Sequence, residues 1–356
     1  TFRHTRNACY LGYITQAIIN NLAPLLFIIF QDSFHISFEM IGRLILINFG
    51  AQLIVDLLAV KFVDKIGYRT SAVLAHLCAA LGLICLSVLP NLLPSPYLGL
   101  CIAVIIYAIG GGLTEVLISP IVDSLPSDGK AASMSLLHSF YCWGQVAVVF
   151  LSTIALKIFG NDIWYLLPLV WSVIPIYNLF RFTKVPLMPA VAEDEKIPLK
   201  KLFSSRLFLL AIILMLCAGA SELSMSQWSS LFAEKGLHVS KVVGDLLGPC
   251  LFAIFMGTGR LLYAWLGDRL PLKKALIGSA LLCVICYLIT VFAPLPLLSL
   301  FGCAFCGFSV ALMWPGVFSL SAQSYPTGGT AMFGILALAG DLGCSVGPWL
   351  AGLFSD

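Results

Sequence analysis

Eleven long apolar stretches dominate this sequence of 356 residues. They cover residues 9–30, 39–62, 70–89, 96–122, 131–157, 163–182, 206–233, 241–266, 273–293, 296–322 and 330–354. A helix of about 20 apolar residues crosses the hydrocarbon core of a bilayer. Lipid offers the backbone no hydrogen-bond partner, so stretches of this length in a membrane fold as helices. We therefore predict an all-α membrane protein with eleven spans.

Composition excludes the soluble classes of protein. Hydrophobic residues make up 60% of the chain and charged residues 10%, and the mean hydropathy is +1.00. A soluble domain carries about 25% charged residues. No nucleophile–base pair, metal-ligand cluster or phosphate-binding glycine loop stands out, since Gly110-Gly111-Gly112 falls inside an apolar stretch. We expect no enzyme activity, no cofactor, no bound metal and no nucleic-acid partner.

The distribution of basic residues predicts the topology. When the amino terminus is placed in the cytoplasm, 15 of the 20 Lys and Arg residues fall on that side, as the positive-inside rule requires. The chain has no Asn-x-Ser/Thr sequence, which favours a bacterial source. We predict a multi-pass protein of the plasma membrane, the inner membrane of a bacterium, acting as a monomer in the lipid bilayer.

One long polar stretch divides the chain. Residues 183–205 contain Glu193-Asp194-Glu195-Lys196 and separate six spans from five. We predict an N-terminal bundle at 1–182, a cytoplasmic linker at 183–205 and a C-terminal bundle at 206–356. The odd number of spans leads us to expect a twelfth helix that the given sequence lacks.

Two charged turns occupy matching places in the two halves. Asp64-Lys65-Ile66-Gly67-Tyr68-Arg69 and Asp268-Arg269-Leu270-Pro271-Leu272-Lys273-Lys274 start 204 residues apart (268 − 64). Each follows one apolar stretch and precedes the next. Such a repeat is typical of internally duplicated transporters. We predict that Asp64, Arg69, Asp268 and Arg269 take part in gating, so that loss of either acid would bias the protein toward one orientation.

The two turns resemble the loop pattern Gly-x-x-x-Asp-Arg-x-Gly-Arg of the major facilitator superfamily. The first copy keeps Asp64 and Gly67, with Lys65 and Val60 at two other positions and Arg69 one residue after the place of the final Arg, and the second keeps Asp268 and Arg269, with Pro271 for Gly. The resemblance implies two six-helix bundles that work by alternating access.

Two Cys-x-x-Cys pairs, Cys283 with Cys286 and Cys303 with Cys306, have the spacing of redox or metal sites. Within an apolar helix, cysteine more often serves as a small hydrophobic residue. No histidine completes a tetrahedral site nearby in the sequence. We expect packing and no disulfides.

Polar residues inside the spans are the candidates for function, because such groups are costly there. The candidate substrate ligands are Asn20, Asn21, Glu115, His138, Gln145, Gln227, Trp228 and Trp314. Glu222 and Glu115 are the candidates for carrying a proton. Other polar groups inside the spans have simpler interpretations. Arg43 lies near an outer edge and can reach water, and His76 can serve in helix packing. Asp56 and Arg260 occupy equivalent positions and fit a structural charge network, and we leave it open whether Asp341 has a functional role.

Three stretches resemble the fucose-type sugar/proton symporters of that superfamily. Asn20-Asn21-Leu22-Ala23-Pro24 stands where that family has Asn-Asn-Leu-Asn-Asp. Glu115 with Ser119-Pro120 resembles Glu-Thr-x-x-Asn-Pro, with Ser119 for the Asn, and His138-Ser139-Phe140-Tyr141-Cys142-Trp143-Gly144 stands where that family has Gln-Ser-Phe-Asn-Pro-x-Gly. The resemblance implies that Glu115 binds sugar and that His138 replaces a sugar-contacting amide. Pro24 replaces the acid linked to the proton, which leaves that role to Glu222 or Glu115.

We predict a secondary active transporter that imports a neutral sugar or polyol together with a proton. Amides, a carboxylate and aromatic rings suit hydroxyl edges and C–H faces, and we expect Asn21, Glu115, His138, Glu222 and Trp314 to face one central cavity. One alternative is a drug or metabolite/proton antiporter, although the 131–157 stretch lacks the Gly-Pro signature of those exporters. Another is a non-transporting membrane receptor, for which a large appended cytoplasmic domain would be typical.

Overall fold

The structure is a computed structural model that describes residues 1–353 apart from 128, 190–196, 234–237, 240–242, 245 and 267–268. Within helices, the side chains at 28, 38, 42, 60, 61, 64, 227, 228, 230, 231, 349 and 351–353 also lie outside the described part. The candidate side chains of Asp64, Gln227 and Trp228, and residue Asp268, are therefore outside it. The described chain is helical and contains no strand.

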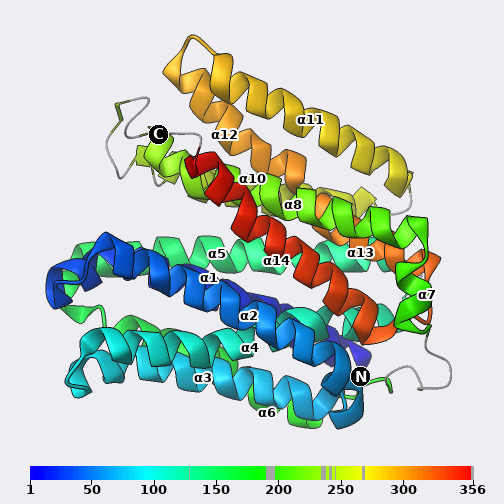
Figure 1. The fold of residues 1–356 in the computed structure, drawn as a ribbon, viewed down its shortest axis with the longest axis horizontal. Coiled ribbons are helices and arrows are strands. Elements are labelled where there is room, and N and C mark those ends of the chain that lie inside the picture. Colours follow the sequence, from blue (N-terminus) through cyan, green and yellow to red (C-terminus); the bar gives the residue numbers. More distant parts are fainter. Residues whose placement is uncertain are drawn as a thin grey trace. The chain divides into compact units, whose positions relative to one another are not determined.

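The first six helices follow the first six predicted spans. They are α1 (Phe2–Phe34), α2 (Phe38–Ile66), α3 (Tyr68–Leu92), α4 (Pro96–Ser124), α5 (Lys130–Phe159) and α6 (Leu166–Lys184), with a 3₁₀ turn, η1 (Asn161–Ile163), before α6. The helices extend beyond the predicted apolar stretches because their ends contain polar residues. The all-α prediction is confirmed (Figure 1).

The second half contains more irregular helices. A short helix α7 (Leu199–Phe203) precedes α8 (Arg206–Leu231), and a π-helical turn η3 (Leu246–Cys250) leads into α10 (Leu251–Leu266). Next come α11 (Leu272–Phe292), α12 (Pro296–Val310), α13 (Met313–Ser324) and α14 (Gly329–Leu353). The predicted span 296–322 is therefore two helices, which a turn at Ala311 and Leu312 separates.

Within the described residues, ten helical segments are long and apolar enough to cross a membrane. Each of the ten coincides with a predicted span, and one of them, Pro296–Ser324, runs through both α12 and α13. Helix α1 is not among the ten, although it has 33 residues. With ten such segments, the chain is a multi-pass membrane protein.

The chain divides into two compact units. Unit 1 contains Thr1–Leu125 and Gly144–Ala192, and unit 2 contains Pro126–Trp143 and Glu193–Asp356. In unit 1, α4 packs against α1, α2 and α3, and α6 packs against α3. In unit 2, α8 packs against α14, and α12 packs against α10 and α11. The boundaries between the two bundles and the linker, at residues 182 and 206, are still a prediction.

A single residue, Gly67, turns the chain from α2 into α3. Its φ of 86° lies in the left-handed region, where glycine is favoured. Two residues later, Arg69 donates to the carbonyl oxygens of Phe182, Thr183 and Val185 at 2.8, 2.7 and 2.9 Å. These are orphan carbonyls at the end of α6, and a cation is favourable there. In this structure Arg69 thus ties the α2–α3 turn to α6.

Glycines allow helices to approach closely in both units. A Cβ atom at Gly110 of α4 would lie 2.6 Å from the carbonyl oxygen of Ala75 on α3. In unit 2, a Cβ atom at Gly343 of α14 would overlap backbone atoms of Leu216 on α8. Small residues of this kind are typical of contacts between membrane helices. The α3–α4 and α8–α14 pairs therefore depend on backbone-to-backbone packing.

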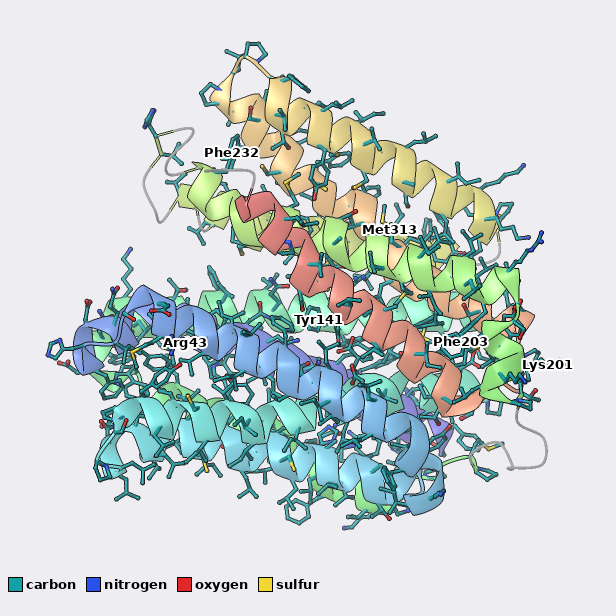
Figure 2. All side chains as sticks on the ribbon, viewed as in Figure 1. Arg43, Tyr141, Lys201, Phe203, Phe232 and Met313 are labelled. Carbon is teal, nitrogen blue, oxygen red and sulfur yellow. The ribbon has the colours of Figure 1, made fainter. Side chains whose placement is uncertain are left out.

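Large apolar side chains are exposed on several helices of each unit. On α11 they recur every three or four residues, which places them on one helix face: Ile277, Leu281, Val284, Leu288 and Val291. Figure 2 shows the side chains on every helix, including Arg43 of α2. Arg43 pairs with Glu39 at 2.6 Å and both side chains are exposed, as expected for charges near a membrane edge.

We predict that Gly343→Ala destabilises the protein whereas Gly278→Ala does not. A new methyl group at 343 meets backbone atoms that cannot turn away, and overpacking of this kind costs about 1–3 kcal/mol. Gly278 is exposed on α11 with no atom within 4 Å of a Cβ, so alanine there adds helix propensity. The measurement is the thermal midpoint of each purified variant in detergent. Equal midpoints for both variants would contradict the close approach of α8 and α14.

Candidate functional site

A chain of hydrogen-bonded amides and one carboxylate crosses three helices of unit 1. Gln16 of α1 donates from Nε2 to Gln52 Oε1 on α2 and to Glu115 Oε2 on α4, both at 3.1 Å. Gln52 in turn donates from Nε2 to Asn20 Oδ1 at 3.1 Å. Gln16 and Gln52 are almost fully buried, at 2% and 1% exposed. The predicted ligands Asn20 and Glu115 thus belong to one connected group.

The bonds of Gln16 determine the orientation of its amide. Both of its partners are acceptors, so the nitrogen of the amide must face them. The carbonyl oxygen, Oε1, then points elsewhere, and it is buried without a hydrogen-bond partner. An unsatisfied buried acceptor costs about 1–3 kcal/mol. The oxygen Oε1 of Gln16 can therefore accept a hydrogen bond from a hydroxyl, an amine or water.

Further hydrogen bonds lie near the chain of amides in unit 1. Tyr13 of α1 and Ser119 of α4 share a hydrogen bond of 2.9 Å between their hydroxyl groups, one turn from Gln16 and Glu115. Asn21 donates to the carbonyl oxygen of Ala17 on its own helix. It does not join the chain of amides. Gln145 of α5 is half-buried.

His76 has partners on both sides of its ring. Nδ1 lies 2.8 Å from the carbonyl oxygen of Ala72, and Nε2 lies 2.8 Å from Nδ2 of Asn178. Asn178 also donates to the carbonyl oxygen of Ala8. The histidine therefore joins α3 to α6, and through Asn178 to α1, as a packing residue would.

Gln16 and Gln52 were missing from the sequence-based candidates. Gln16 lies four residues before Asn20, so both fall on one face of α1. On α2, buried polar side chains recur every four residues at Asn48, Gln52 and Asp56. This period of four in an apolar helix is the signal that identifies Gln52.

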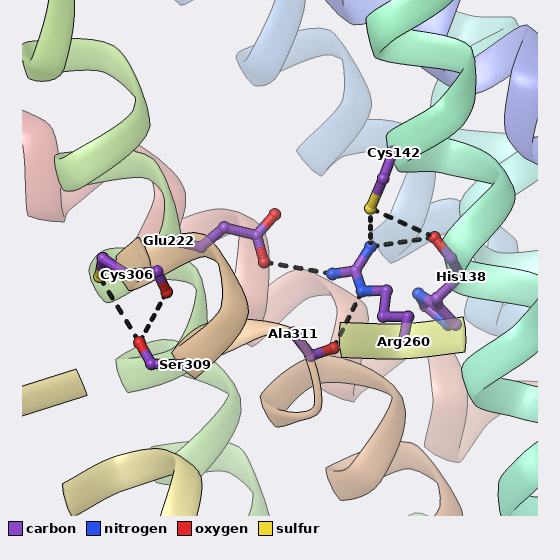
Figure 3. A network of polar contacts seen from close by, with 7 residues as sticks. All are labelled: His138, Cys142, Glu222, Arg260, Cys306, Ser309 and Ala311. Atoms are coloured by element: carbon purple, nitrogen blue, oxygen red, sulfur yellow. Dashed lines mark hydrogen bonds and ion pairs between the residues drawn. The ribbon is translucent and has the colours of Figure 1, made fainter. Parts of the chain in front are cut away.

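Arg260 of α10 is the centre of a second polar group, in unit 2 (Figure 3). Its Nε donates to the carbonyl oxygen of Ala311 at 2.9 Å, within the turn between α12 and α13. Its Nη1 donates to the carbonyl oxygen of His138 and to Cys142 Sγ, both at 3.0 Å. Ser135 donates to the backbone carbonyl of Arg260 at 2.8 Å. The guanidinium group is thus held between α5 and the α12–α13 turn.

Glu222 of α8 contacts the same guanidinium more loosely. Its Oε2 lies 3.4 Å from Arg260 Nη2, longer than the 2.7–2.9 Å of a strong charge-assisted hydrogen bond. The side chains are 13% and 3% exposed. Arg260 therefore keeps its backbone partners if Glu222 moves away, whereas Glu222 is the exchangeable member of the group. The sequence interpretation placed Arg260 in a structural charge network and did not name Glu222 as its partner.

The remaining candidates lie in different surroundings. The His138 side chain is buried and its ring lies 5.7 Å from that of Phe318. Trp314, in the first turn of α13, packs edge-on against Phe318 at 6.3 Å and covers Gly340 of α14. Arg269 is exposed after α10. Arg260 therefore contacts the side chain of Glu222 and the backbone carbonyl of His138, and Trp314 packs beside the α12–α13 turn.

Solved structures show where else this fold occurs. The E. coli fucose:proton symporter FucP matches with a TM-score of 0.82 at 16% identity, covering 99% of this chain and 92% of that one. The proton:xylose symporter XylE of E. coli matches with a TM-score of 0.78 at 14% identity, covering 99% and 88%. The human organic anion transporter MFSD10 matches at 0.77 and 17%, covering 98% and 92%. At these identities the likeness concerns the fold.

A search among curated proteins gives no match. The family profile described as Major Facilitator Superfamily, in contrast, matches residues 9–348. That range contains all ten membrane-crossing segments and both polar groups. The chain belongs to the major facilitator superfamily.

Proposed function

We propose that this protein is a secondary active transporter that imports a neutral sugar or polyol together with a proton. The observation that carries the proposal is the amide–carboxylate chain of unit 1, with its partnerless acceptor at Gln16 Oε1. The superfamily membership supports a carrier, and the similar fold of FucP and XylE supports a sugar.

The chemistry of the chain suits a polyhydroxylated solute. Each sugar hydroxyl both donates and accepts, and amide side chains do the same. Glu115 can accept from two neighbouring hydroxyls, while Gln16 Oε1 accepts from a third. Binding would replace hydrogen bonds that the side chains now make to one another. A neutral solute therefore enters without leaving a buried charge unpaired.

Glu222 is the residue that we assign to the proton. The ionised carboxylate is attracted to Arg260, and protonation of one of its oxygens removes that attraction. Because Arg260 keeps its bonds to the carbonyls of Ala311 and His138, the change is confined to Glu222 and the helix that carries it, α8. Proton binding can then alter the packing of α8 without unfolding the group.

A second candidate is a carrier of organic anions. The buried guanidinium of Arg260 favours it, since the carboxylate of a substrate could take the place of Glu222. MFSD10, whose fold is similar, is an organic anion transporter. In that case the amide chain of unit 1 would bind the polar body of the anion.

Uptake into proteoliposomes separates the two candidates. We expect one labelled neutral sugar or polyol from a panel that includes fucose and xylose to accumulate when the outside is made acidic. Accumulation should vanish when a protonophore collapses the gradient. Accumulation of organic anions with no uptake of any sugar would overturn the proposal in favour of the second candidate. Uptake that does not depend on the pH gradient would contradict proton coupling.

We predict that Glu222→Gln abolishes accumulation driven by pH but leaves exchange of labelled for unlabelled substrate. Exchange moves no net proton, so it does not need the carboxylate. Glu115→Gln should lower both activities, because it removes a substrate ligand. Both rates are measured in the same proteoliposomes.

Glu39→Gln is the matched control for these variants. Its carboxylate lies on the exposed end of α2, paired with Arg43, and the change should leave both activities as in the parent. If Glu222→Gln accumulates substrate as well as the parent does, the proton is carried elsewhere.

A further inference from the structure

Four cysteines meet between α11 and α12 in unit 2, outside the group around Arg260. Cys283 and Cys286 come from α11, and Cys303 and Cys306 from α12. Their exposed fractions are 6%, 1%, 1% and 0%. None of these four forms a disulfide in the described chain. The spacing of three residues puts both members of each pair on the same face of its helix.

The core around these thiols is rich in sulfur. It comprises Cys142, Met225, Phe252, Met256, Cys283, Cys286, Cys303, Cys306, Val310 and Ala311. Seven of these ten buried residues carry a thiol or a thioether. Packing alone can account for such side chains in an apolar core, so a chemical role for them needs a further reason.

The distance between two of the sulfurs indicates what that reason is. Cys283 Sγ and Cys306 Sγ lie 4.0 Å apart. A disulfide needs about 2.05 Å. Two thiolates that each hold one metal ion at about 2.3 Å lie roughly 3.8 Å apart at a tetrahedral angle and 4.6 Å apart in a line. At the observed spacing the two thiols are in hydrogen-bond contact, and an ion held in a line between them requires the sulfurs to separate by about 0.6 Å, which rotation of the two side chains can supply.

Ser309 supports the pair from α12. Its hydroxyl donates to the carbonyl oxygen of Cys306 at 2.6 Å and lies 3.7 Å from Cys306 Sγ (Figure 3). Partners of this kind orient a ligand and tune it. The Ser309 hydroxyl therefore lies within reach of the Cys306 sulfur and can turn to donate to a thiolate there.

We propose that Cys283 and Cys306 bind one soft, thiol-seeking metal ion of the Cu(I) type between α11 and α12. In the described chain, no group of three or more His, Cys, Asp or Glu side chains is arranged to hold a metal. The site is thus two-coordinate, with sulfur ligands only. Zn²⁺ normally takes four ligands, whereas thiolates and thioethers select Cu(I).

Binding has a defined proton balance. Two neutral thiols and one Cu(I) give a bis-thiolate complex and release two protons. Affinity must therefore rise with pH, by up to about 100-fold per pH unit while both thiols start protonated. A site made of thioethers or of backbone oxygen atoms would show no such dependence.

Competition with bicinchoninate, a Cu(I) chelator, tests the site on the full chain. The purified protein is titrated in detergent without oxygen, with Cu(I) kept reduced by ascorbate. We expect one ion per chain to be retained against the chelator, and Cys283→Ser and Cys306→Ser each to weaken binding at least 100-fold. Cys78→Ser in α3 and Cys217→Ser at an exposed position of α8 should bind as the parent does.

Two further variants guard against loss of fold. Cys283→Ala and Cys306→Ala should also lose the ion while eluting from a sizing column as the parent does. The proposal is overturned if the parent retains no Cu(I) or if the Cys283 and Cys306 variants retain it as the parent does. It is also overturned if the affinity of the parent for Cu(I) does not change with pH. Loss of free thiols on purification, reversed by a reductant and blocked by Cys283→Ser, would show a disulfide instead and overturn it as well.

Discussion

Polar side chains inside the hydrocarbon region must find their hydrogen-bond partners within the protein, and this requirement organises both units. In unit 1 it joins α1, α2 and α4 through Gln16, Gln52 and Glu115. In unit 2 it holds the guanidinium of Arg260 against backbone carbonyls from α5 and from the α12–α13 turn. Helices that are otherwise apolar thus meet in one register, because any shift would leave a buried polar group unsatisfied.

The two groups differ in how completely they are satisfied, and that difference suggests their roles. Gln16 Oε1 has no partner, which favours binding of a further donor. Glu222 has Arg260 as a partner, but at 3.4 Å, which favours exchange between a charged and a neutral state. Arg69, in contrast, makes three short bonds to the end of α6 and stabilises a turn. A transporter needs all three kinds of contact: an acceptor that can bind a ligand, an ion pair that can break, and hydrogen bonds that hold a turn in place.

Hydropathy was enough to predict the helices, because crossing a bilayer demands long apolar segments. Hydropathy alone did not predict the turn at Ala311 and Leu312, because both residues are apolar. Pro315 was the available signal: it has no N–H to donate to the carbonyl oxygen of Ala311, and that oxygen accepts from Arg260 instead. Glu115 and Glu222 could be selected from the sequence because a carboxylate in an apolar helix is conspicuous. The partners of Gln16, Gln52 and Arg260 could not be assigned, because they come from other helices. The π-helical turn before α10 likewise has no clear signal except Pro249.

The central claim is that the amide–carboxylate chain binds a hydroxyl of the substrate through Gln16. Its most direct test is the dissociation constant of the transported sugar and of each single-deoxy analogue, for the parent and for Gln16→Leu. If Gln16 Oε1 accepts from one hydroxyl, the analogue that lacks it should bind about 10-fold more weakly than the sugar to the parent. The same analogue and the sugar should bind equally to Gln16→Leu. Equal losses for that analogue in the parent and in Gln16→Leu would contradict the claim.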